Sequence, residues 1–160
     1  MSTKIKLLIW CAIGLFYCSL CAGCRATEEC KAFTDLSREQ QRVEFRTFSI
    51  EKQLDIYLCA MKAKPPDLSF AQYVADRGEE VIPIVIAKMK TVRKEVEQED
   101  LIYILELISD RGDLRGRKDI MAELSQIIDA MKIDTVRERS LEKLKKIEIN
   151  SGIRPLTYTK

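Results

Sequence analysis

The sequence predicts an all-α fold, a bundle of about five to seven helices. Apolar residues recur at helical spacing along most of the chain, and no segment alternates apolar and polar residues between hairpin turns. The chain has 160 residues, of which 46% are hydrophobic and 32% charged, with few glycines and prolines. This composition is typical of one globular domain.

Helical periodicity and end signals define seven segments. The predicted helices are 37–46, 49–64, 68–76, 79–92, 97–110, 117–132 and 135–148. The first begins at a capping box, in which Ser37 and Gln40 each bind the backbone amide of the other. The second ends at Pro65 and Pro66, because proline cannot donate a helical hydrogen bond and restrains the residue before it.

The later helices follow the same rules. Pro83 is tolerated because it falls in the first turns of its helix, where no partner for its nitrogen is needed. The segment 97–110 is apolar around most of its circumference, so we expect it to be the most buried helix, with Leu105 at its centre. Asp134 is the predicted cap of the last helix.

Two helix pairs share a spacing. The first helices of these pairs start near residues 79 and 117, about 38 residues apart, and the second helices repeat at the same interval. This period is similar to that of the HEAT and armadillo α-solenoids, and the resemblance covers about 70 residues without a diagnostic motif. It implies stacked helical hairpins. A packed bundle whose helices have similar lengths fits the same spacing.

The N-terminus has the three parts of an export signal: a short basic stretch, an uncharged apolar stretch, and small residues before Cys24. Residues 20–24, Leu-Cys-Ala-Gly-Cys, resemble the lipobox of bacterial lipoproteins. The resemblance implies that Gly23 ends the signal, that Cys24 carries the lipid, and that Arg25 after it favours the outer membrane. Cys21 departs from the leucine that lipoboxes prefer.

Two other interpretations of this segment stay open. The ordinary signal peptidase could cut at the same small residues and release a soluble protein, or the apolar stretch could remain as an anchor, although it is short for a spanning helix. The lipoprotein interpretation divides the chain into a signal peptide (1–23), a tether (24–34), a helical domain (35–149) and a flexible tail (150–160). It places the protein in the cell envelope, on the periplasmic face of a Gram-negative outer membrane or at the cell surface.

Six cysteines lie at positions 11, 18, 21, 24, 30 and 59. If the signal is removed and Cys24 carries lipid, Cys30 and Cys59 remain, and in an exported protein such a pair predicts a disulfide. Two unpaired thiols are the alternative. The spacing of Cys18, Cys21 and Cys24 is also that of iron–sulfur ligands, but these residues lie in or beside the export segment.

The composition excludes several functions. The chain has no histidine, which removes Ser–His and Cys–His nucleophile pairs and every metal site that needs histidine. Beyond residue 23 basic and acidic residues are equal in number, so nothing in the charge predicts a nucleic-acid partner. We assign no catalytic residue, cofactor or metal.

Three local features invite a functional interpretation. Acidic residues gather between 95 and 113, but without the spacing of a calcium loop. Residues 111–113 spell Arg-Gly-Asp, a tripeptide that adhesion receptors recognise and that also suits a turn between helices. Lys143, Lys145 and Lys146 alternate with apolar residues, which fits a membrane-facing amphipathic helix or cations placed near a helix C-terminus.

The leading functional hypothesis is a binding or assembly module, held at the membrane by the lipid on Cys24, that contacts another envelope protein. Paired helices often offer a surface for a partner segment. Pilotins, small helical lipoproteins of secretion systems, are similar in architecture, and a scaffold role belongs to the same class. The alternative is an envelope enzyme that uses carboxylates, such as a cell-wall glycoside hydrolase, which needs two acids about 5–9.5 Å apart.

Overall fold

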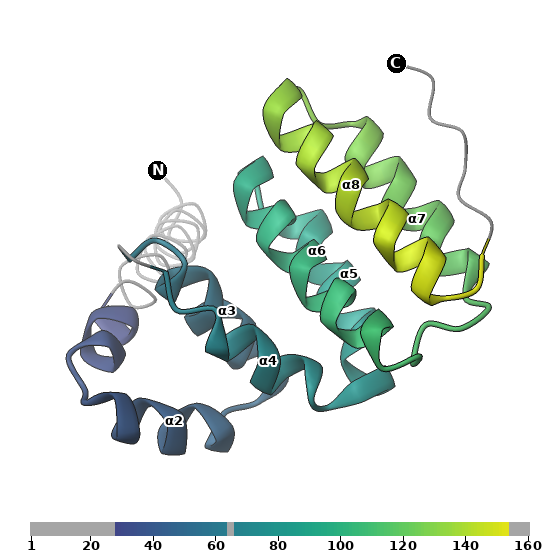
Figure 1. Cartoon of the computed structure of the whole chain (residues 1–160). Helices are drawn as coiled ribbons and strands as arrows, with labels where there is room; N and C mark the ends of the chain where they lie inside the picture. The colour runs from purple at the N-terminus through teal and green to yellow at the C-terminus, as the bar shows by residue number, and fades with distance from the viewer. Residues whose placement is uncertain (1–27, 64–65, 154–160) are drawn as a thin grey trace, which may run out of the picture. The chain divides into compact units, whose positions relative to one another are not determined.

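The computed structural model describes residues 28–63 and 66–153, and within them every regular element is a helix. Residues 28–34 are helical, and the elements that follow are α2 (Arg38–Thr47), α3 (Ile50–Ala60), α4 (Ser69–Ala75), η1 (Gly78–Val81), α5 (Ile82–Thr91), α6 (Glu95–Asp110), α7 (Lys118–Asp129) and α8 (Asp134–Asn150). Figure 1 shows their arrangement. The predicted export signal and lipid site lie outside the described residues. The all-α prediction is confirmed.

The described residues divide into two compact units, one ending at Val43 and one beginning at Glu44. In the first unit, the predicted capping box is present: the Ser37 amide donates to Gln40 Oε1 at 3.0 Å, and the Gln40 amide donates to Ser37 Oγ at 3.3 Å. The side-chain amide of Gln41 closes the preceding turn by donating to three backbone carbonyls, those of Phe33, Thr34 and Leu36. These bonds fix the start of α2.

The second unit consists of three helical hairpins, α3/α4, α5/α6 and α7/α8. Within each hairpin the two helices pack together, and each helix also packs on its counterpart in the next hairpin. The second helices α4, α6 and α8 therefore form one layer, and the first helices α3, α5 and α7 form the other (Figure 1). The sequence period identified the last two hairpins. It missed the first, because α4 has only 7 residues and the spacing is shorter there.

The core centres on α6, which packs against α4, α5 and α8. Five of its apolar side chains are fully enclosed: Leu101, Ile102, Ile104, Leu105 and Ile108. Neighbouring helices cover α6 on several sides because its apolar residues occupy most of its circumference. Leu105 is enclosed at the middle of the helix, as predicted. Helix α6 holds more buried residues than any other described helix, but α3 buries a larger share of its own, so the prediction that α6 is the most buried helix holds by number and not by proportion.

Two predicted helix ends differ from the structure. The helix expected over 79–92 begins as the 3₁₀ turn η1, and α5 proper begins at Ile82, so Pro83 still falls in its first turn. The helix expected to reach residue 64 ends at Ala60, because the amides of Lys62 and Ala63 bond three residues back and tighten the last turn.

The predicted cap of the last helix is wrong. Helix α8 includes Asp134 as its first residue, and the capping position is Ile133, which has no side-chain acceptor. Asp134 instead accepts a hydrogen bond from Arg137 at 2.6 Å. The carboxylate near the start of α8 comes from another hairpin, as described below.

Candidate functional site

Ion pairs join each hairpin to the next. In the layer of first helices, Lys88 of α5 pairs with Asp55 of α3, and Lys90 of α5 pairs with Glu123 of α7. The partners are 33 residues apart in both cases, so the pairs follow the hairpin repeat. These side chains are partly exposed, and each such pair contributes little stability alone. Their main effect is to fix which helices face each other.

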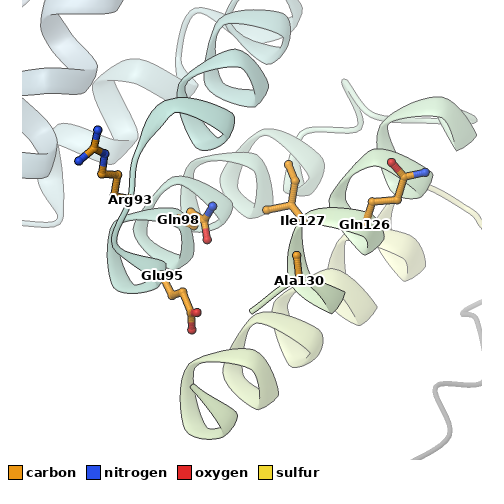
Figure 2. A pocket seen from close by; sticks show the side chains of 6 residues that line it. All are labelled: Arg93, Glu95, Gln98, Gln126, Ile127 and Ala130. Carbon is orange, nitrogen blue, oxygen red and sulfur yellow. The ribbon is translucent and has the colours of Figure 1, made fainter. Parts of the chain in front are cut away.

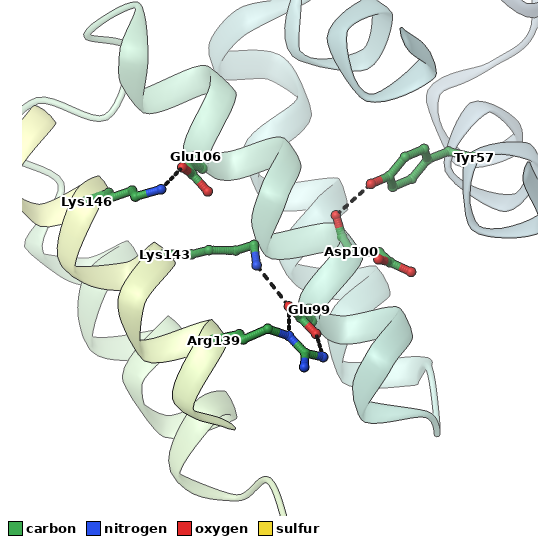
Figure 3. A network of polar contacts seen from close by, with 7 residues as sticks. All are labelled: Tyr57, Glu99, Asp100, Glu106, Arg139, Lys143 and Lys146. Carbon is green, nitrogen blue, oxygen red and sulfur yellow. Dashed lines mark hydrogen bonds and ion pairs between the residues drawn. The ribbon is translucent and has the colours of Figure 1, made fainter. Parts of the chain in front are cut away.

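The layer of second helices contains a more buried network, drawn in Figure 3. Glu99 of α6 is only 8% exposed. It accepts two hydrogen bonds from Arg139 of α8, at 2.8 and 2.7 Å, and a third from Lys143 at 2.9 Å. About two turns further along α6, Glu106 pairs with Lys146 at 3.2 Å. A buried carboxylate is thus paired by two cations from the adjacent hairpin.

The surroundings of Glu99 keep it ionised. Burial raises the pKa of this carboxyl, but the hydrogen bonds from Arg139 and Lys143 and their positive charges more than offset burial, so the pKa lies below its usual value. Glu99 therefore acts as a structural anion between α6 and α8.

The residue that follows Glu99 is in a different situation. Asp100 lines a pocket of about 280 Å³, which we call the Asp100 pocket. Its lining consists of Tyr57, Met61, Leu68, Glu99, Asp100, Tyr103 and Lys143. The pocket lies where the end of α3 and the loop before α4 meet α6 and α8.

The carboxylate of Asp100 has no donor among the described residues. Figure 3 shows it directed away from Arg139 and Lys143, whereas Glu99 points toward them. The fully buried Tyr57 donates its hydroxyl hydrogen to the backbone oxygen of Asp100 at 3.0 Å, so this bond leaves the carboxylate unsatisfied. Burial and the negative charge of Glu99 raise the pKa of Asp100 to about 6.

A second pocket, of about 370 Å³, lies beside the turns of the last two hairpins (Figure 2). It is lined by Arg93, Glu95, Gln98, Gln126, Ile127 and Ala130. Glu95 accepts hydrogen bonds from the backbone amides of Lys132 and Ile133, at 2.7 and 2.8 Å, and these bonds lower its pKa. Gln98 donates to the carbonyl of Met89 at 3.0 Å. Because Glu95 and Gln98 already bond to the backbone, the Asp100 pocket, with its unbonded carboxylate, is the better candidate site.

The same end of each hairpin exposes one large apolar side chain. Leu68 precedes α4, Val96 lies in the first turn of α6, and Ile133 precedes α8. Their exposed fractions are 46%, 48% and 49%. We call these three residues the apolar edge. Since neighbouring helices pack about 8–10 Å apart, the edge is on the order of 20 Å long. Leu68 belongs both to this edge and to the Asp100 pocket.

The predicted cysteine pair is present: Cys30 and Cys59 are disulfide-bonded in the structure. The lipid site predicted at Cys24 falls outside the described residues. No helix among those described is long and apolar enough to cross a membrane.

The Arg-Gly-Asp tripeptide is part of the fold. Arg111 donates to the carbonyl of Ala75 at 3.1 Å and pairs with Asp76, which ties the end of α6 to the end of α4. Gly112 has φ +88°, a left-handed conformation that glycine adopts without steric cost. These contacts account for the tripeptide as a turn.

The basic stretch of α8 is explained by packing. Lys143 and Lys146 pair with acids of α6, and the alternating apolar residues Leu144 and Ile147 are fully buried in the protein. The interpretation of α8 as a helix with an apolar face toward the membrane is therefore wrong. Among the acidic residues of the described part of the chain, no group of three is arranged to hold a metal ion.

Comparison with known proteins gives no relative: no protein-family model, curated protein or solved structure matches this chain.

Proposed function

We propose that this chain is a lipid-anchored binding module of the cell envelope, which holds a segment of another envelope protein along its apolar edge. The anchoring half of the proposal rests on residues 20–24, whose resemblance to a lipobox makes Cys24 the lipid-bearing residue. The binding half rests on the described hairpins.

The apolar edge is the observation that supports binding of a partner segment. A single exposed apolar residue is ordinary on any protein surface and needs no explanation. Here three hairpins in succession expose one at nearly the same position, Leu68, Val96 and Ile133, so the residues form a row. A row on the order of 20 Å long matches a short helix or extended segment, which partner proteins commonly insert against stacked helical pairs.

The enzyme alternative needs two carboxylates facing each other across a cleft. The Asp100 pocket has two acids, but they are consecutive residues of one helix, and Glu99 is already bound by Arg139 and Lys143. Asp100 alone does not make the pair that glycoside hydrolysis requires. The binding module is therefore the function we propose, with escort of an outer-membrane subunit or scaffolding as roles within that class.

The anchoring half is tested by labelling cells with a radioactive or clickable fatty acid. The protein should incorporate the label, and Cys24→Ala should abolish it and leave unprocessed precursor. Normal labelling and maturation of the Cys24→Ala protein would contradict anchoring.

The binding half is tested by photocrosslinking in the native envelope. A photoreactive amino acid at position 133 should give a discrete adduct that disappears when Val96→Ser is introduced. The control is a photoreactive residue at position 149, because Ile149 is 57% exposed but does not belong to the apolar edge. Identical adducts at both positions, or none at position 133, would contradict a binding edge.

A further inference from the structure

We propose that the Asp100 pocket binds the positively charged side chain of an arginine or lysine in the partner segment. This inference deepens the proposed function, on which it rests, by naming the chemistry that the partner presents beside the apolar edge.

The first observation in favour of a cation is the way in which the charged groups around the pocket are paired. Glu99 is paired with Lys143 and Arg139, so its negative charge is compensated within the protein. Lys143 and Arg139 act on Asp100 only through their charge, and no described residue pairs with its carboxylate or donates a hydrogen bond to it. The pocket therefore presents a carboxylate without a donor, close to a second carboxylate and to Lys143, and partly withdrawn from water.

The ionised form of such a carboxylate is destabilised in the folded protein, which is the electrostatic conflict at this site. Its pKa of about 6 expresses that conflict, because the neutral acid is favoured over the anion by burial and by the charge of Glu99. A cation in the pocket would stabilise the anion by adding positive charge beside it and by supplying the missing hydrogen-bond donors. An acid whose pKa is shifted by burial and by a neighbouring charge, and which lies in a pocket, is therefore a candidate for binding a cation.

The size and lining of the pocket select the form of the cation. At about 280 Å³ it is slightly below the range of pockets that enclose drug-sized ligands, and it suits one long side chain. Met61 and Leu68 supply apolar surface for an aliphatic stem, as arginine and lysine require when only the head is charged. Tyrosine rings in the lining are a further favourable surface for a cation.

The position of the pocket selects a protein segment as the carrier. Leu68 lines the pocket and also begins the apolar edge, so a segment lying along that edge passes the entrance. One basic residue of that segment would enter the pocket while neighbouring apolar residues contact Val96 and Ile133. The charge fixes the register of the segment, and the apolar contacts supply area.

The test uses the full chain in a neutral detergent and four fluorescent peptides with leucine-rich flanks. They differ only at a central residue, which is arginine, citrulline, lysine or norleucine. Citrulline has nearly the shape of arginine without its charge. Fluorescence anisotropy should give affinities at least about tenfold higher for the arginine and lysine peptides than for the two neutral ones.

Two variants identify the residue responsible. Asp100→Asn keeps the shape and removes the charge, and it should abolish the preference for the charged peptides. Glu142→Gln removes an exposed carboxylate of α8 that does not line the pocket, and it should keep the preference. Equal affinity for the arginine and citrulline peptides, binding of neither, or an unchanged preference in Asp100→Asn would overturn the inference.

The result is separable from the proposed function. In one outcome, crosslinking at position 133 depends on Val96 while the arginine and citrulline peptides bind equally. That result would support binding along the apolar edge and contradict the cation site. If the charged peptides are preferred but no adduct forms at position 133, the pocket binds a cation that does not come from a segment on the edge, which contradicts both proposals as stated.

Discussion

Arg139 donates two hydrogen bonds to the two carboxylate oxygens of Glu99, at 2.8 and 2.7 Å. This two-point geometry is the most directional form of ion pair, and it joins helices of different hairpins. Because the carboxylate is buried and the guanidinium is half exposed, the acid depends on the bond more than the base does.

The first prediction concerns Glu99→Gln. The variant loses the charge that Arg139 and Lys143 share and leaves these donors poorly satisfied, so the free energy of unfolding should fall by about 1–3 kcal/mol. Urea unfolding of the full chain measures it. The matched control is Asp134→Asn, whose pair with Arg137 is exposed and should change stability by less than about 0.5 kcal/mol. Equal effects of the two variants would show that the Glu99 network contributes no more stability than an exposed ion pair.

The second prediction is a pH-dependent gain of stability in Asp100→Asn. The pKa of Asp100 is raised from 3.8 to about 6, so the folded protein binds its proton more tightly than the unfolded chain does. The contribution of Asp100 to the free energy of unfolding is fully present below about pH 4, where the group is protonated. It is lost as the pH rises through 6 and the group ionises in the folded protein. Asparagine does not ionise, so the variant should be more stable than the parent by about 1–3 kcal/mol at pH 7.5.

The advantage of Asp100→Asn should shrink as the pH falls and vanish near pH 4. The ionisable groups around Asp100 are Tyr57, Glu97, Glu99, Tyr103, Arg139 and Lys143. Thermal melts of both proteins at several pH values give the difference, which cancels pH effects common to the two. A constant difference across this range would contradict the raised pKa.

The third prediction tests the core. Leu105 is fully buried at the middle of α6, so Leu105→Ala removes its transfer free energy and leaves a cavity, which together cost about 2–5 kcal/mol. Lys145→Ala, on the exposed face of α8, should change stability by less than about 0.5 kcal/mol. Thermal unfolding of the full chain compares them. If the two variants had the same melting temperature, α6 would not be central to the fold.

The fourth prediction concerns the disulfide. Peptide mapping of the protein from the envelope, without reduction, should recover Cys30 and Cys59 in one linked peptide. Two thiols that react with an alkylating reagent in native, unreduced material would contradict the bond. The variant Cys59→Ser offers the control, since it should leave Cys30 free to react.

Local signals in the sequence predict the helices well. The capping box of Ser37 and Gln40 and the position of Pro83 are set by residues within a turn of each other, and both appear in the structure as expected. The end of α3 and the start of α8 were missed, because a tightened last turn and a carboxylate from another hairpin decide them.

The candidate site was not predictable in the same way. Glu99 and Arg139 are 40 residues apart, and Tyr57 and Asp100 are 43 apart, so only the packing of hairpins brings them together. One signal was present: acids and bases recur at offsets close to the hairpin period, as in Asp55 and Lys88. Searching for charged pairs at that offset would have found the ion pairs, but not the unpaired acid of the pocket.

The hydrogen bonds of Glu95 restrict the lengths of the turns after α5 and α7. It begins α6, yet its carboxylate binds the amides of Lys132 and Ile133 ahead of α8, across two neighbouring turns. An added or deleted residue in either turn would move the acceptor away from its donors. The turns after α5 and α7 are therefore poor places for insertions, tags or grafted loops.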